Sequence, residues 1–313
     1  MPQSFHYPPI LSLVSPPRLS SYQAVFSPSC DAELFGTYVW AQHVVGAVYP
    51  ITQAVEVSLR NSVDNAARTK FGAKWWKLPQ YQTPAHADFQ GCMQKAENTL
   101  TKAWRASERI RLHLPKHAVV PSAVPTWSHD KIVAATEFST WGHVLSDAFS
   151  ASTRAQQSTH LWPVLMGTAF RKYNLLSSSS VDARHQIMNI VHEIREYRNR
   201  LFHHDKIWVS SGTSSNPRSA IDSIRKKINK METLLNVIDA RLPIIMTKVG
   251  VLDNARRVCS MNELDIYRYA FREPHLTSKK KRLMRSLTTN SENRNSTTAW
   301  NYGGSVYGMY KIR

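Results

Sequence analysis

Hydrophobic residues recur at steps of three and four along most of the chain, which is the spacing of one face of an α-helix. Over residues 36–59 this spacing predicts a long helix with one buried face. Pro50 lies within the run and is expected to divide or kink the helix, because proline lacks a backbone donor. The predicted buried face consists of Tyr38, Val45, Val48, Ile51, Val55 and Leu59.

Three later stretches have the same helical pattern. They predict helices at about residues 85–111, at residues 130–149 and from residue 181 to about residue 201. Four consecutive serines at residues 177–180 are expected to link and cap the last of these helices. Strands of a half-buried sheet would alternate polar and apolar positions, and we see no such series in the sequence. The pattern therefore predicts an all-α fold.

The most regular pattern follows a polar loop at residues 209–217. Asn216 and Pro217 have the residue types of an N-cap and a first helical position. Hydrophobic residues then alternate between steps of three and four, and Pro243 closes the series. This seam is either the core-facing side of one helix or a zipper-like contact between two protomers. Its members are Ile221, Ile224, Ile228, Met231, Leu235, Ile238 and Leu242.

Composition changes at both ends of the chain. Residues 1–30 are rich in proline and serine, and we expect an irregular segment there. Residues 274–313 contain the run "SKKKRLMRS" followed by Asn, Ser, Thr and Gly, and they predict a disordered basic tail that stays flexible. Residues 31–273, between these two ends, form the predicted helical domain.

The chain is strongly basic. It has 40 Lys and Arg residues against 22 Asp and Glu residues, which gives a net charge of +18. The tail holds eight Lys or Arg residues and one Glu, so a net charge of +11 remains for residues 1–273. Such an excess favours an anionic partner, either a nucleic acid or an anionic membrane surface.

Several features favour a cytoplasmic protein without a membrane span. The most apolar stretch, residues 36–59, does not reach about 18 uninterrupted apolar residues. The N-terminus lacks the basic start, apolar core and cleavage site of a secretory signal. The three cysteines, Cys30, Cys92 and Cys259, form no CxxC pair and are odd in number. They therefore indicate neither a zinc ribbon nor a disulfide framework.

One basic segment, "EYRNRLFHHDKIW" at residues 196–208, carries the candidate chemistry. The sequence contains no Walker loop and no GxGxxG, HExxH or GxSxG motif, and we predict neither a cofactor nor a metal site. Histidine titrates near neutral pH and can act as an acid or a base. Arginine stays charged and can direct two donors onto phosphate oxygens. Together with Asn199, these residue types suit RNA cleavage that needs no metal ion.

The spacing within this segment constrains its geometry. On a continuous α-helix six residues correspond to about 600°, so Arg198 and His204 would point about 120° apart. Either the helix ends near Leu201 and the histidines turn back, or a second copy of the chain completes the site. The spacing by itself is common in proteins. A purely structural interpretation is a basic helix end whose cations are stabilised by the helix dipole.

The segment "IREYRNRLFHHDKIW" resembles the signature of the Abi-like family of bacterial proteins, a family of the HEPN superfamily. The matching residues are Arg195, Arg198, Asn199, Arg200, Leu201, His203, His204, Asp205 and Ile207. A second block at residues 54–76 resembles the first half of that family through Glu56, Arg60, Asn61, Phe71, Gly72 and Trp75. The resemblance extends from about residue 17 to residue 208, and residues 138–162 depart most from it.

The resemblance implies a HEPN-like antiparallel helical bundle with peripheral helices. It also implies a homodimer that places two such motifs at one cleft. The implied activity is that of a metal-independent endoribonuclease, acting as a toxin or abortive-infection effector in phage defence. In that activity Arg198, Asn199 and His204 are the catalytic residues. The supporting candidates are His203, Arg200 and Glu193, and the structural or site-supporting candidates are Glu56, Arg60 and Asn61.

Arg60 and Asn61 also have a structural interpretation, as a polar pair buried against the catalytic helix.

Control by an antitoxin is a separate question. Some HEPN toxins carry a tyrosine two residues after the catalytic histidine, and their antitoxin modifies that tyrosine with AMP. Lys206 stands at this position here, so this form of control is not expected.

Two other functions fit the sequence. The chain could be a catalytically silent HEPN-like protein that binds RNA or serves as a scaffold, or a basic helical protein whose tail contacts DNA. The intact set of Arg198, Asn199 and His204 favours the ribonuclease, with RNA as its partner. The sequence identifies neither the RNA target nor an antitoxin or phage trigger.

Overall fold

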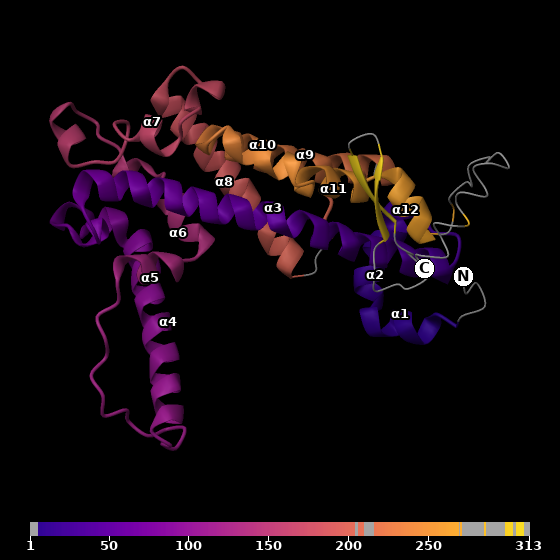
Figure 1. The fold of residues 1–313 in the computed structure, drawn as a ribbon, viewed down its shortest axis with the longest axis horizontal. Coiled ribbons are helices and arrows are strands. Elements are labelled where there is room, and N and C mark those ends of the chain that lie inside the picture. Colours follow the sequence, from indigo (N-terminus) through magenta and orange to yellow (C-terminus); the bar gives the residue numbers. More distant parts are fainter. Residues whose placement is uncertain are drawn as a thin grey trace.

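The computed structural model describes residues 6–203, 206–209, 216–268 and 270, Arg285, and residues 298–302 and 305–309. Its body is all-α, as predicted from the sequence. One long helix, α3 (Asp31–Phe71), crosses the molecule, and most other helices pack along it (Figure 1). In the predicted tail, residues 298–302 and 305–309 form two antiparallel strands, β1 (Thr298–Tyr302) and β2 (Ser305–Met309), which the sequence pattern did not predict.

The sequence predicted that Pro50 divides or kinks this helix, and α3 continues through Pro50, so the proline does not divide it. Proline removes the hydrogen bond to the carbonyl four residues earlier, which belongs to Gly46. Both Pro50 and Gly46 are exposed, so water can solvate that carbonyl. The opposite face of the helix is anchored in the core. Val48, Ile51, Val55 and Leu59 of the predicted face are fully buried there, and Tyr38 and Val45 are half-buried.

The N-terminal segment was predicted to be irregular, and that prediction was wrong. It forms helices α1 (Pro8–Val14) and α2 (Pro16–Phe26). Each of these helices begins with proline, which fits the first helical turn because its ring fixes φ and no backbone donor is needed there. The apolar side of α2 packs against α3 and against Trp208, the last aromatic residue of the basic segment.

Helix α4 (Ala87–Arg111) confirms the helix predicted at about residues 85–111 and projects from the body (Figure 1). The helix predicted at residues 130–149 is instead broken into α5 (His129–Ala134), α6 (Phe138–His143) and the 3₁₀ turn η4 (Asp147–Phe149). Thr136 explains the break. Its hydroxyl donates to the carbonyl of Val133 and accepts from the indole of Trp141, so it competes with the helical backbone.

Shorter elements complete this half of the chain. They are η1 (Trp75–Lys77), η2 (Pro79–Tyr81), η3 (Pro84–His86), η5 (Ala155–Ser158), α7 (Met166–Ala169) and η6 (Tyr173–Leu175). Helix α8 (Ser180–Phe202) follows, and Ser179 caps it by accepting from the backbone of Asp182, as the serine run predicted.

Helix α9 (Pro217–Ile238) begins as predicted, with a capping box in which Asn216 and Ser219 bond each other's backbone. The hydrophobic seam lies in the core of its own chain, which excludes the zipper-like contact between protomers. Its first six members, from Ile221 to Ile238, are at most 5% exposed. The helix ends before Asp239, and the last seam residue, Leu242, is half-buried in α10 (Arg241–Lys248).

Helices α11 (Val251–Val258) and α12 (Met261–Arg268) close the body against α3. The indole of Trp40 donates to the carbonyl of Val258 at 2.9 Å, which ties the start of α3 to α11. Gly36 lets the backbone of α12 approach α3, because a Cβ at this position would collide with the carbonyl group of Tyr267. No helix in the described part of the chain is long and apolar enough to cross a membrane.

Candidate functional site

A pocket of about 420 Å³ lies where the C-terminal half of α8 meets α3 and the break between α5 and α6. It gathers three residues that were predicted from sequence regions far apart, because α8 and α3 pack side by side. Two cations, two carboxylates and several polar groups face the same space. The lining residues are Glu56, Thr136, Glu137, Phe138, Ser139, Arg195, Arg198 and Asn199.

One face of α3 supplies its side of the site. Tyr49, Glu56 and Arg60 are separated by seven and four residues, so they lie within about 40° of one another around the helix. Tyr49 contacts the ring of Phe202, with centroids 5.4 Å apart, and Glu56 contacts Arg198. Arg60 donates from Nη1 to the carbonyl of Ala134 at 3.3 Å, at the end of α5.

The guanidinium of Arg198 is held on two sides. Its Nε lies 3.9 Å from Oε2 of Glu56, and its Cζ lies 4.5 Å from the centre of the Phe202 ring. Neither Nε nor that carboxylate oxygen has a hydrogen-bond partner within the described residues. The ion pair and the cation–π contact therefore orient the guanidinium and leave its terminal amines for an anion.

The break between α5 and α6 forms the opposite wall. Because Thr136 interrupts the helix, Glu137 takes an extended backbone conformation and turns the chain so that Thr136, Glu137 and Ser139 line the pocket. This wall was missed in the sequence, where the region was predicted as one helix. Arg195 was also missed as a site residue, although it lies one helical turn before Arg198 and so shares its face.

Asn61 does not belong to this pocket. It is exposed on another face of α3, where its Oδ1 accepts from Nε of Arg60 at 3.3 Å. Arg60 and Asn61 therefore form a polar pair, as the structural interpretation held, but the pair is not buried. Helical geometry gives the reason, since neighbouring residues point about 100° apart. Only Arg60 reaches the wall of the site.

Glu193 faces α9 rather than the pocket. Its carboxylate accepts from Lys230 at 2.5 Å and from Lys227 at 2.9 Å. Hydrogen bonds from Lys230 and then Lys227 hold the pKa of this carboxyl below its ordinary value. Glu193 therefore joins two helices and does not take part in the predicted site.

The remaining candidates lie at the end of α8. The helix ends at Phe202, and exposed His203 is its C-cap, so the prediction that the helix ends near Leu201 is confirmed. Arg200 is half-buried on a different face from Arg198. His204, the predicted catalytic histidine, lies outside the described residues.

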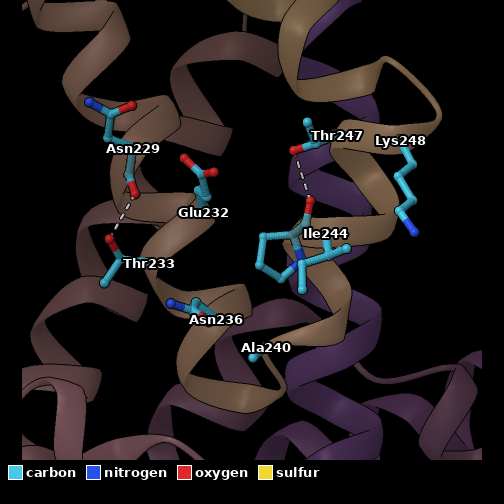
Figure 2. Close-up of a pocket in the computed structure, with 9 residues that line it drawn as sticks. Asn229, Glu232, Thr233, Asn236, Ala240, Ile244, Thr247 and Lys248 are labelled. Atoms are coloured by element: carbon cyan, nitrogen blue, oxygen red, sulfur yellow. Dashed lines mark hydrogen bonds between the residues drawn. The ribbon is translucent and has the colours of Figure 1, made fainter.

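A separate groove of about 600 Å³ runs between α9 and α10 (Figure 2). Its polar side chains are largely hydrogen-bonded to other groups of the protein. The hydroxyls of Thr233 and Thr247 donate to backbone carbonyls one turn earlier in their own helices, and Glu232 accepts from Arg256. It contains none of the predicted site residues, so the pocket beside Arg198 is the better candidate for a functional site.

Comparison with known proteins gives one match. The sequence model of the family described as Abi-like protein matches residues 17–209, which is more than half of the chain and includes every residue of the pocket. No curated protein and no solved structure matched the chain in the other two comparisons.

Proposed function

The chain belongs to the Abi-like protein family, and on this basis we propose that it is a metal-independent endoribonuclease of HEPN type that acts in abortive infection. The observation that supports this proposal most directly is the pocket that brings Arg198 and Asn199 together with Glu56 at the end of α8. His203 and His204 of the motif come directly after Phe202, the last residue of α8, in the sequence. Phosphate chemistry needs a fixed cation and a titratable group in this kind of arrangement.

Arg198 has the properties of a phosphate-binding residue. Arginine carries a positive charge on a planar guanidinium, whose amines match phosphate oxygens two at a time. Glu56 and Phe202 fix its direction before substrate binds, which lowers the cost of ordering it. In the proposed reaction Arg198 stabilises the charge that develops on the phosphate, and Asn199 positions the phosphate or Arg198.

His204 is the proposed proton-transfer residue. Attack of the ribose 2′-hydroxyl on phosphorus requires that hydroxyl to lose a proton, and the leaving 5′-oxygen must gain one. Imidazole can do either near neutral pH. The products would be a 2′,3′-cyclic phosphate and a 5′-hydroxyl end.

A second copy of the chain is part of the proposal. Tyr49 and Phe202 lie beside Arg198 and remain 43% and 40% exposed. Two adjacent exposed aromatic side chains are suited to being covered, and a homodimer that joins two sites into one cleft would cover them. RNA would then contact both motifs.

The direct test is incubation of the purified chain with end-labelled RNA in the presence of EDTA. Cleavage is expected to persist in the chelator and to leave 2′,3′-cyclic phosphate ends. It should fall about 100-fold or more in Arg198→Ala and in His204→Ala, because each removes a group that acts in the transition state.

Two surface residues provide matched controls. His192 pairs with Glu196 on the exposed side of α8, and Arg111 pairs with Glu108 on α4. His192→Ala and Arg111→Ala should cut RNA at the wild-type rate. RNA binding without cleavage at any pH from about 5 to 9 would contradict the enzyme and support the silent RNA-binding protein instead.

A further inference from the structure

A groove of about 730 Å³ beside α3 lies on the face away from the Arg198 pocket. It runs between residues 57–69 of α3, the chain after α7 and the junction of α9 with α10. Asn61 and Asn65 point about 140° and 180° away from Glu56 around the helix. The groove is therefore a separate site, and the proposed cleavage chemistry does not account for its polar residues.

The wall formed by α3 presents two amides. Asn61 and Asn65 are one turn apart, and both are exposed in the groove. Neighbouring hydroxyls are already used, since Ser62 donates to the carbonyl of Ala169 and Thr69 to that of Asn65. The Oδ1 of Asn61 already accepts from Nε of Arg60 at 3.3 Å, so Asn61 offers mainly its amide donors. Asn65 offers donors and an acceptor side by side, which is the pattern that matches the edge of a nucleobase.

The facing wall carries two guanidiniums that share one carboxylate. Asp239, at the end of α9, accepts from Arg171 at 2.9 Å and from Arg241 through both of its oxygens at 2.9 and 2.6 Å. The Asp239 side chain is only 18% exposed, whereas Arg171 and Arg241 are 60% and 77% exposed. The two cations thus face the groove, and the acid that orients them lies beneath them.

Backbone hydrogen bonds hold the chain at this cluster, and the Asp239 carboxylate remains charged. The backbone of Arg171 donates to the carbonyl of Ile238 at 3.2 Å, and the backbone of Arg241 donates to Asp239 at 3.0 Å. Hydrogen bonds from the side chain and backbone of Arg241 hold the pKa of Asp239 well below its usual range. Most N–H donors of the two guanidiniums take no part in these hydrogen bonds.

We propose that this groove binds a nucleotide, with its phosphate on Arg171 and Arg241 and its base or ribose on Asn61 and Asn65. The volume lies within the usual range of small-molecule sites. The same chemistry is offered by a free nucleotide and by one nucleotide of an RNA strand. In the second form the inference rests on the proposed ribonuclease function, with the groove holding substrate at a distance from the cleaved bond.

The test is titration calorimetry on the full chain carrying Arg198→Ala, so that RNA is not cut. The probes are the four nucleoside 5′-monophosphates, inorganic phosphate, and a single-stranded RNA of about ten nucleotides. At least one probe that contains a base should bind about tenfold more tightly than inorganic phosphate. Arg241→Ala and Asn65→Ala should each weaken that binding about tenfold.

This experiment distinguishes a free nucleotide from one nucleotide of an RNA strand. Mononucleotide binding that both variants weaken identifies a free ligand, and an effect confined to RNA identifies part of the substrate. Arg111→Ala, which removes a paired exposed arginine on α4, should leave all affinities unchanged. Equal affinities in the Arg198→Ala parent and in both groove variants made from it would overturn the proposal. It would also be overturned if the groove variants altered only the sedimentation coefficient of the protein.

A cleavage assay keeps this result apart from the proposed function. If the wild-type chain cuts RNA but the groove variants bind every probe normally, only the nucleotide site is wrong. If no RNA is cut but a mononucleotide still binds and is lost in Asn65→Ala, the groove stands and the ribonuclease proposal fails.

Discussion

Arg198 and Phe202 are four residues apart on α8, which brings a guanidinium over an aromatic ring at the edge of the pocket. The sequence placed Arg198 in the site, but it did not distinguish Phe202 from an ordinary apolar residue. Exposure makes the difference, since Phe202 is 40% exposed and so is not a core residue. Its ring also contacts Tyr49 of α3, and the order of residues along the chain does not reveal that contact.

Replacing Phe202 with leucine tests this positioning role. Leucine keeps an apolar side chain but has no ring face for the guanidinium, and an exposed cation–π contact contributes about 0.5–1 kcal/mol. We expect kcat for RNA cleavage to fall about two- to fivefold with little change in thermal stability. Phe202→Tyr should restore the wild-type rate. Equal rates for the leucine and tyrosine variants would show that the ring does not position Arg198.

At the scale of elements, helix α3 is the helix against which most of the others pack. Its sequence pattern predicted a buried face, and that face is buried, because apolar spacing depends on local geometry alone. Its continuity through Pro50 was not predictable in the same way. The free energy from packing α9, α11 and α12 against it outweighs a local loss of about 3 kcal/mol or more at proline.

Two glycines of α3 provide a matched test of this packing. Gly36→Ala should destabilise the protein by about 1–3 kcal/mol, because the new Cβ forces the backbone of α12 away. Gly46→Ala meets no atom within 4 Å and should be neutral or stabilise the helix by up to about 1 kcal/mol. Chemical denaturation followed by circular dichroism measures both. A Gly36→Ala variant as stable as the wild type would disprove the close approach of α12.

At the scale of the whole molecule, the N-terminal helices anchor the end of the basic segment at residues 196–208. Trp208 is 1% exposed, and its ring lies 4.9 Å from that of Tyr22 and 5.0 Å from that of Phe26. Helix α2 therefore lies against the end of the "HHDKIW" segment, almost two hundred residues away in the sequence. A segment predicted to be irregular turns out to support the region next to the site.

Trp208→Ala should cost about 3–5 kcal/mol of stability, because it leaves a large cavity between α2 and the motif. The indole Nε1 has no hydrogen-bond partner among the described residues, so Trp208→Phe should cost much less. Thermal unfolding compares the two variants. If the proposed ribonuclease activity is present, Trp208→Ala should reduce it even below the melting transition. Identical melting temperatures for the two variants would contradict this anchoring role.

The sequence by itself determined the all-α class, the start of α9, and both ends of α8 to within one or two residues. These features depend on interactions within a few residues of one another, namely apolar spacing, capping and the end of a helix. Only the tertiary structure decided that Glu56 and Arg60 face the site while Asn61 faces another groove, and that the broken helix at Thr136 forms a wall. It also decided that the seam of α9 is core. Those outcomes depend on which faces of distant helices pack together, and local spacing does not specify that.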